Sequence, residues 1–192
     1  RYEVACSEGM GYLVDRAPSG APKAVDCMSA AVGGQTCTLT TKEQMNAFVG
    51  AIAARSGRPC TISDARIMGS TSSGSTYYEL ACTGSQGYVM ETKAGAFVRA
   101  LDCLEAAGIG GGCTLTNISA VAEAREGQYL AALRAKGIAC NGTEFRLLGK
   151  DSQRRDVVEF LCTDRPSGLV AFIPQTGGGD ITNFDCFEAE GR

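Results

Sequence analysis

The chain has 192 residues, with ten cysteines, no histidine, no tryptophan and a formal net charge of −3. The lack of histidine excludes Ser-His-Asp and Cys-His catalysis and every histidine-ligated metal site. No apolar run approaches the roughly 18 residues that a membrane-spanning helix needs, and without a basic block the composition argues against nucleic-acid binding.

The first predicted strand is Tyr2–Cys6, and similar segments recur twice along the chain. Tyr-Glu-Val-Ala-Cys at 2–6 matches Tyr-Glu-Leu-Ala-Cys at 78–82 and Val-Glu-Phe-Leu-Cys at 158–162. The alternation of side chains predicts strands with one buried face. A further strand follows a glycine turn in each case, at 11–14, 87–91 and 168–173.

Two helices are predicted after these strands. A short helix follows Asp26, Asp102 and Asp185, because a glutamate three residues after the second and third of these acids gives the capping-box form. We therefore interpret the three aspartates as helix caps and not as catalytic acids. A longer amphipathic helix is predicted over 42–55 and again over 119–136, where apolar residues recur on one face.

A strand is also predicted just upstream of the second and third Glu-containing segments. Folding the chain back at the loop 69–76, and likewise at 149–156, gives the apolar pairs Ala65/Leu80, Ile67/Tyr78, Phe145/Phe160 and Leu147/Val158. The same register places Arg66 opposite Glu79 and Arg146 opposite Glu159, on the side that we expect to face solvent. Two independent stretches that give the same pairs predict antiparallel hairpins.

These elements predict an α+β protein of tandem disulfide-stapled repeats, each a small antiparallel β-meander with a short capped helix and a longer amphipathic helix. The repeats are expected at 1–60, 61–140 and 141–192, the third being truncated. The first repeat lacks its leading strand, so either strand 61–68 folds back to serve its own repeat or the edge at Tyr2–Cys6 is open. An open edge can accept a strand from a partner chain.

The cysteines indicate a disulfide framework, since they include no CxxC pair of the kind that usually marks thiolate metal sites. With a chain that begins at Arg1 and not at Met, they predict a secreted or periplasmic protein whose leader was removed. Sequential pairing is preferred because the last repeat holds only two cysteines: Cys6–Cys27, Cys37–Cys60, Cys82–Cys103, Cys113–Cys140 and Cys162–Cys186. The competing scheme joins Cys60–Cys82 and Cys140–Cys162 across repeats, and it leaves Cys6 and Cys186 without a bridge.

The sequence nominates no catalytic residue, metal site or cofactor. Glu3, Glu79 and Glu159 are interpreted as strand residues, and the glycine runs at 110–112 and 177–179 as turns. The residues expected to contact a ligand lie on or beside the hairpin loops: Tyr77, Ser72, Ser73, Arg154 and Arg155. Asn117 and Asn141 begin glycosylation sequons, which matter only in a host that glycosylates.

The leading hypothesis is a non-enzymatic extracytoplasmic protein that acts as a structural or accessory protein-binding subunit of a cell-envelope or extracellular assembly. The partner is expected to be a protein, and the edge strand Tyr2–Cys6 is the candidate docking position. The alternative is a carbohydrate-binding module or a secreted hydrolase inhibitor that presents loops 69–76 and 149–156. A histidine-free glycoside hydrolase that uses two carboxylates would need an acid unique to one repeat and placed inside a cleft, and the sequence nominates none.

Overall fold

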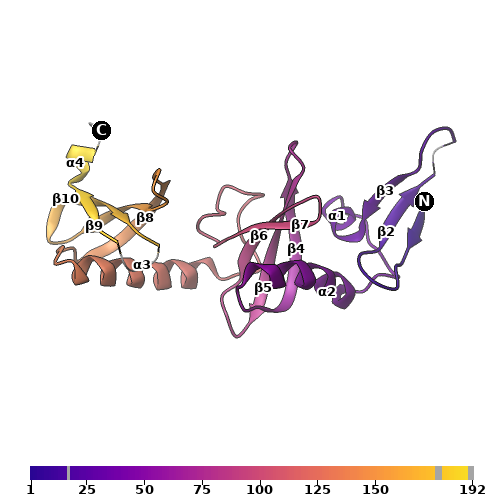
Figure 1. Ribbon diagram of the computed structural model, residues 1–192, viewed down its shortest axis with the longest axis horizontal. Coiled ribbons are helices and arrows are strands. Elements are labelled where there is room, and N and C mark those ends of the chain that lie inside the picture. The colour runs from indigo at the N-terminus through magenta and orange to yellow at the C-terminus, as the bar shows by residue number, and fades with distance from the viewer. Residues whose placement is uncertain (17, 176–178, 190–192) are drawn as a thin grey trace. The chain divides into compact units, whose positions relative to one another are not determined.

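The computed structural model describes residues 1–16, 18–175 and 179–189 and has an α+β fold with three antiparallel sheets (Figure 1). The chain forms two compact units, Arg1–Ile118 and Ser119–Arg192. The first unit contains two of the sheets and the second unit contains the third.

The first sheet is small and has the order β1-β2-β3. Its strands are β1 (Tyr2–Val4), β2 (Tyr12–Asp15) and β3 (Lys23–Asp26), and the short helix α1 (Cys27–Val32) follows directly. Asp26 caps α1, because its carboxylate accepts a hydrogen bond from the backbone N–H of Ser29 at 2.8 Å. The prediction of a capped helix at this aspartate is confirmed.

The second sheet has four strands in the order β4-β5-β6-β7. They are β4 (Thr61–Ser70), β5 (Ser75–Thr83), β6 (Tyr88–Lys93) and β7 (Ala96–Leu101), preceded by α2 (Lys42–Ala53) and a 3-10 turn at Ala54–Ser56. Thr41 and Gln44 form a capping box at the start of α2. Val49 and Ile52 of α2 are buried in one core with Leu80 and Met90 of the sheet, so α2 covers the apolar face of the strands that follow it.

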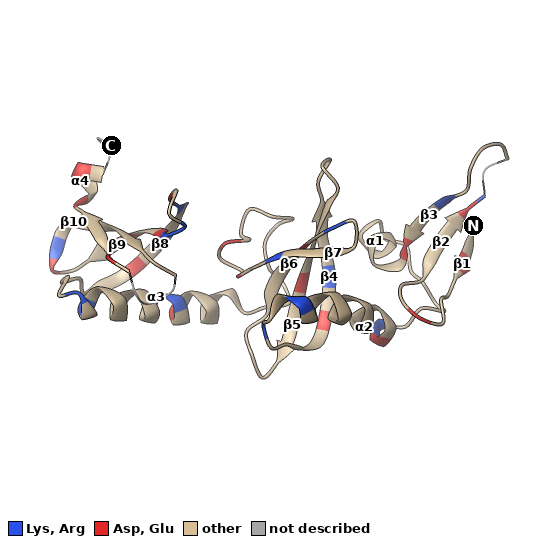
Figure 2. Ribbon diagram, viewed as in Figure 1, with Lys and Arg blue, Asp and Glu red and all other residues tan. Residues whose placement is uncertain are grey.

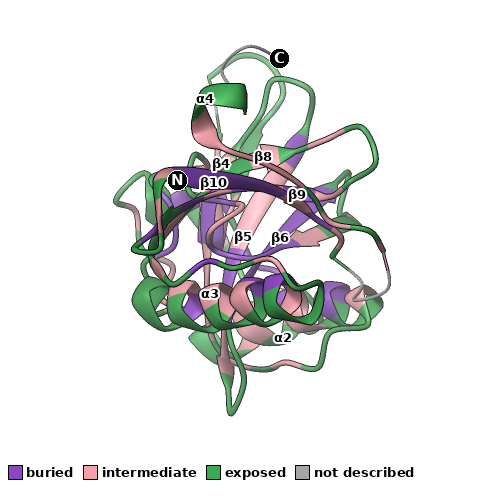
Figure 3. Ribbon diagram, turned by 90° about the vertical axis from the view of Figure 1, so that its left-hand side faces the viewer, coloured by how far each residue is buried: buried purple, intermediate pink, exposed green. Residues whose placement is uncertain are grey.

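The third sheet, in the second unit, has the order β11-β10-β9-β8. It comprises β8 (Gly142–Lys150), β9 (Asp156–Cys162), β10 (Arg165–Ile173) and β11 (Thr182–Phe184), with α3 (Ile118–Ala135) before it and α4 (Cys186–Ala189) after it. Tyr129 and Leu133 of α3 share a core with Phe160 and Leu169, and much of β9 and β10 is buried (Figure 3). The relation of helix to sheet is therefore the same as for α2.

Both predicted hairpins have the expected register. Ile67 lies opposite Tyr78 and Arg66 opposite Glu79 in the β4–β5 pair, and Arg146 lies opposite Glu159 in the β8–β9 pair. The two long helices also fall within two residues of the predicted ranges. The predicted fold class, α+β, is confirmed.

Some elements differ from the prediction. A fourth strand, β7 or β11, follows the three that were expected in the second and third sheets, and β3 adds a third strand to the first. Residues 103–107 after Asp102 form turns and not a helix, although Asp102 and Glu105 make the reciprocal capping hydrogen bonds. The glycines at 110–112 form the expected turn with positive φ angles, whereas 177 and 178 lie outside the described residues.

The predicted sequential disulfide pairing is wrong. The four bridges among the described residues are Cys27–Cys37, Cys60–Cys82, Cys103–Cys113 and Cys140–Cys162. Two of them close loops after the last strand of a sheet, and two join the segment before β4 or β8 to the end of the neighbouring strand. Cys6, predicted to be bridged, is a free thiol, and Cys186 belongs to none of the four bridges.

Peptide mapping after trypsin digestion under non-reducing conditions should show this pairing. Cys27 and Cys37 fall in one tryptic peptide, 24–42, so we expect an internal bridge there, and another within 100–125. Peptides 56–66 and 67–93 should be joined to each other, as should 137–146 and 156–192. A link between 2–16 and 24–42 would instead support the sequential scheme.

Candidate functional site

A buried carboxylate, Glu79, anchors the loop that follows the second sheet. Its side chain is fully buried and accepts hydrogen bonds from the backbone N–H groups of Thr114, Leu115 and Thr116 at 2.7–3.0 Å. Arg66 Nε donates a further hydrogen bond at 2.7 Å. Burial alone would raise the pKa of Glu79, but the hydrogen bonds from these donors outweigh it and hold the pKa below its ordinary value.

Glu3 makes the same contacts in the first sheet. Its carboxylate accepts hydrogen bonds from the backbone N–H groups of Thr38, Leu39 and Thr40 at 2.6–2.9 Å. The pKa of Glu3 also lies below its ordinary value, because these hydrogen bonds outweigh a desolvation effect that would raise it. In the described part of the chain, however, no lysine or arginine pairs with Glu3.

Glu159, at the same strand position in the third sheet, has different surroundings. It pairs with Arg146 at 2.8 Å, and the Sγ of Cys186 lies 3.9 Å from its Oε1. Among the described residues, no backbone N–H group comparable to those of the Thr-Leu-Thr loop donates a hydrogen bond to it. Its side chain is 30% exposed, in contrast to that of Glu79.

The expectation that the Glu79 carboxylate faces solvent is therefore wrong. The alternation of strand residues does place it on the side opposite Tyr78, but the loop after the sheet covers that side. The recurrence of Cys-Thr-Leu-Thr at 37–40 and 113–116 is the sequence signal for this loop. The loop needs Gly87 as well, because a Cβ atom there would lie 2.3 Å from Thr116 Oγ1 and 2.4 Å from the carbonyl oxygen of Leu80.

These glutamates do not form metal sites. Glu3 lies near the sulfurs of Cys27 and Cys37, and Glu79 near those of Cys103 and Cys113. Each sulfur pair is a disulfide, which offers no thiolate to a metal ion. The carboxylates are engaged by amide donors, so we interpret both clusters as structural anchors.

A second buried carboxylate, Asp156, joins elements of the second unit. It is 1% exposed and accepts hydrogen bonds from Tyr129 Oη at 2.8 Å, Arg125 Nη1 at 3.2 Å and Gln175 Nε2 at 3.2 Å. Burial and then the neighbouring Asp156 raise the pKa of Tyr129. Each donor comes from a helix or a loop that packs on the sheet, so this network holds α3 to the strands.

The first sheet differs from the other two in two ways: β1, which matches the internal strands β5 and β9, lies at its edge, and one of its faces is uncovered. β1 pairs with β2 only, so its outer backbone groups face no other strand in the described chain (Figure 2). Val4 pairs with Tyr12, and Tyr2 lies two residues from Val4 on the same strand. The three side chains therefore lie on one face of this sheet. Their exposed fractions are 65%, 47% and 39%, which is unusual for large apolar side chains grouped on one sheet.

The corresponding face is buried in the other two sheets. Leu80 and Tyr88, which match Val4 and Tyr12 in the sequence, are 0% and 3% exposed beneath α2. Phe160 and Leu169 occupy the same strand positions beneath α3 and are both fully buried. The face of the first sheet therefore has the composition of a covered surface but lacks a covering helix in the described structure.

Cys6 lies at the end of the same open edge. The matching cysteines, Cys82 and Cys162, each form a disulfide with a cysteine that precedes the neighbouring strand. Among the described residues β1 has no such neighbour, and Cys6 is a partly buried free thiol. The open edge, the bare face and this thiol together form the candidate site, which we call the β1 site.

None of the residues predicted to bind a ligand belongs to the β1 site. Ser72 and Ser73 lie exposed at the tip of the β4–β5 hairpin, and Tyr77 packs against a small core that includes Met68. Arg154 is exposed in the β8–β9 turn with a φ of 60°. Arg155 donates a hydrogen bond to Asp151 at 2.8 Å and lies over the ring of Phe172, so it holds its own hairpin in place.

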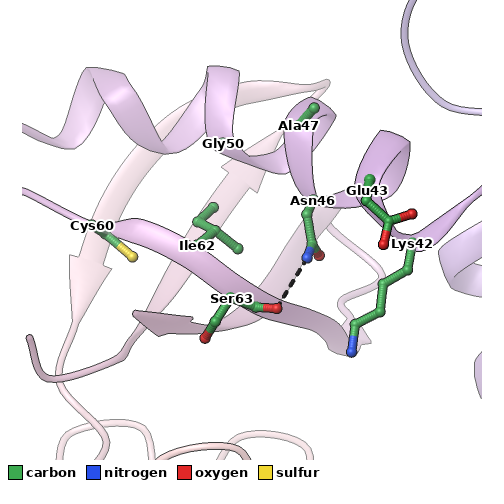
Figure 4. A pocket seen from close by; sticks show the side chains of 8 residues that line it. All are labelled: Lys42, Glu43, Asn46, Ala47, Gly50, Cys60, Ile62 and Ser63. Atoms are coloured by element: carbon green, nitrogen blue, oxygen red, sulfur yellow. Dashed lines mark hydrogen bonds between the residues drawn. The ribbon is translucent and has the colours of Figure 1, made fainter. Parts of the chain in front are cut away.

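A cavity of about 590 Å³ lies between α2 and the start of β4. Its lining residues are Lys42, Glu43, Asn46, Ala47, Gly50, Cys60, Ile62 and Ser63 (Figure 4). Asn46 Nδ2 donates a hydrogen bond to the carbonyl oxygen of Ser63 at 3.3 Å, and Lys42 pairs with Asp64 at 2.7 Å. These contacts hold the helix to the strand, so we interpret the cavity as the space left between these two packed elements.

Comparison with protein-family models, curated proteins and solved structures found no match to this chain. The function is therefore inferred from the geometry of the chain itself.

Proposed function

We propose that this chain is a non-enzymatic extracytoplasmic protein that binds a protein partner through the β1 site, as a structural or accessory subunit of a cell-envelope or extracellular assembly. The observation that carries the proposal is the exposed apolar face next to an unpaired strand edge. Unpaired edges bind further strands through main-chain hydrogen bonds, and apolar side chains beside them supply burial.

The disulfides support the extracytoplasmic part of the proposal. Four bridges among the described residues fit a protein that matures in an oxidising compartment. No helix in the described part of the chain is both long and apolar enough to cross a membrane. We further propose that the chain is a tandem repeat, since the same strand register and the same disulfide spacing occur in the second and third sheets.

The non-enzymatic part rests on how the buried acids are used. Glu79 and Asp156, the two carboxylates with almost no exposure, are each surrounded by donors from their own unit. A catalytic carboxylate needs access to a substrate, and neither of these side chains has it. The net charge is −3, and Lys and Arg residues are interspersed with acidic residues along the ribbon (Figure 2), which does not favour a polyanionic partner.

The alternative, a sugar-binding module or hydrolase inhibitor that uses the hairpin loops, has less support. Tyr77 is half-buried and Arg155 is engaged by Asp151, Thr182 and Phe172, so neither is presented freely to a ligand. The β1 site has the larger group of exposed apolar side chains.

Substitutions on the bare face test the proposal. In the organism that produces the protein, the wild-type chain should co-purify with a partner, and Tyr2→Lys or Val4→Asp should remove that partner. Leu161→Asp is the matched control, because Leu161 is also an exposed apolar strand residue, at 55%, but lies in the other unit. Equal recovery of the partner by all variants, or a wild-type protein that is always a lone monomer, would refute the proposal.

A further inference from the structure

We infer that the β1 site takes a helix–cysteine–strand segment of a partner polypeptide and that the cysteine of this segment forms a disulfide with Cys6. The inference rests on the proposed function and names the chemistry of the partner. In each of the two matching sheets, a helix, a cysteine and a strand of this chain lie against the strand that matches β1. The described chain supplies no such segment at β1.

The position of the partner cysteine follows from the strand registers. Cys60 lies two residues before Ile62, which is paired in register with Cys82. Cys140 likewise lies two residues before Gly142, which is paired with Cys162. A cysteine two residues before the residue that faces Cys6 would therefore be correctly placed to bridge to it.

The partner strand should also carry an arginine. Arg66 and Arg146 each lie six residues after the bridging cysteine and form ion pairs with Glu79 and Glu159. Glu3 holds the same strand position, receives the three amide hydrogen bonds and has no cationic partner in the described chain. An arginine on the incoming strand would complete these contacts through a charge-assisted hydrogen bond.

Apolar residues should flank that arginine. Ala65 and Ile67 pair with Leu80 and Tyr78 across the β4–β5 hairpin, and Phe145 and Leu147 pair in the same way across β8–β9. At β1 the corresponding residues are Val4 and Tyr2. The expected partner motif is therefore Cys, four residues, apolar, Arg, apolar.

A helix before the cysteine would cover the bare face. α2 ends at Ala53 and α3 at Ala135, a few residues before Cys60 and Cys140 respectively. Both helices bury the sheet face that corresponds to Val4 and Tyr12. The same arrangement in the partner would bury apolar side chains that are now exposed.

The covalent step is a thiol–disulfide exchange that needs a small-molecule disulfide as the source of oxidation. The partner cysteine is first held as a mixed disulfide with a low-molecular-weight thiol. The thiolate of Cys6 attacks the partner's sulfur, the new disulfide forms, the mixed disulfide breaks, and the small thiol leaves and takes up the proton that Cys6 lost.

The chain itself supplies a probe for the test. A synthetic peptide of residues 42–70, with Cys60 as its glutathione mixed disulfide, carries the helix, the cysteine and the strand motif. Mixed with the full-length protein at about 10 μM, it should crosslink to Cys6 about 100-fold faster than an undocked peptide, because docking raises the local thiol concentration to the mM range. The rate is followed by intact mass, and the link is located by peptide mapping.

Matched controls separate docking from simple thiol reactivity. Peptides with Arg66→Glu or Ile67→Asp keep the cysteine. The first places a negative charge opposite Glu3 and the second places one opposite Tyr2, so both should react at the undocked rate. The protein variant Val4→Asp should react slowly with the original peptide, and Cys6→Ser should give no crosslink at this position. Equal rates for all peptides, or preferential formation of a Cys6–Cys6 dimer between two copies, would overturn the inference.

This result is independent of the test of the proposed function. If Tyr2→Lys and Val4→Asp remove the native partner but the peptide reacts only at the undocked rate, the binding role stands and the inferred partner motif is wrong. If those substitutions leave the native partner bound, the proposed function itself fails.

Discussion

Replacing Glu79 with alanine should destabilise the Arg1–Ile118 unit by about 3–5 kcal/mol, the usual cost of removing one partner from a buried ion pair. The change leaves the guanidinium of Arg66 without its carboxylate, and it leaves the backbone N–H groups of Thr114–Thr116 without an acceptor. Urea denaturation followed by circular dichroism measures the loss of unfolding free energy.

Glu159→Ala is the matched control, since Glu159 has the same strand position and the same kind of arginine partner. Its ion pair is exposed to solvent and lacks the amide donors, so its removal should cost at most about 1 kcal/mol. Equal losses for the two variants would contradict the anchoring role of Glu79.

The dependence of this effect on pH has a defined sign. Because the pKa of Glu79 in the folded protein is below its ordinary value, its contribution to stability is fully present above about pH 4.3, the ordinary pKa of glutamate. The contribution is lost as the pH falls through the lower, folded-state pKa. The difference in stability between wild type and Glu79→Ala should therefore shrink on acidification.

Replacing Phe160 with alanine should destabilise the second unit by about 3–5 kcal/mol through the loss of buried apolar surface and the cavity that remains. Phe160 is fully buried, and its ring lies 6.2 Å from that of Tyr129 on α3 and 6.4 Å from that of Phe145 on β8. The same urea titration measures the effect.

The neighbouring residue gives the control. Leu161 is on the same strand but is 55% exposed, so Leu161→Ala should change the unfolding free energy by no more than about 0.5 kcal/mol. A loss for Phe160→Ala as small as this would show that the third sheet and α3 do not share the core described above.

The strands other than β3, β7 and β11, the long helices and the hairpin registers could be predicted because their signals are local. Alternation decides which face of β5 is apolar, and the pairing of Arg66 with Glu79 follows once the hairpin turn is placed. The sheet order pairs β4 with β5, and among the described residues β1 pairs with β2 only, so the edge at Tyr2–Cys6 is open.

The disulfide pairing could not be predicted, because it depends on which loop returns to which strand. Cys27 and Cys37 are joined across a short loop whose end also reaches Glu3, and the spacing of cysteines alone does not distinguish this from the sequential scheme. An apolar helix face likewise does not reveal which strands it covers, and α2 shares a core with the strands that follow it.

The bridge between Cys103 and Cys113 ends one residue before the first amide that binds Glu79. Reduction of that bridge would release the ring that keeps Thr114 in position, and the affinity of Glu79 for a proton would rise toward that of a free glutamate. Oxidation state and the pH dependence of stability are thus coupled in this unit: a reductant would lower its stability at neutral pH and would flatten the loss of stability on acidification, because a carboxylate with the same pKa in the folded and unfolded states adds no pH dependence.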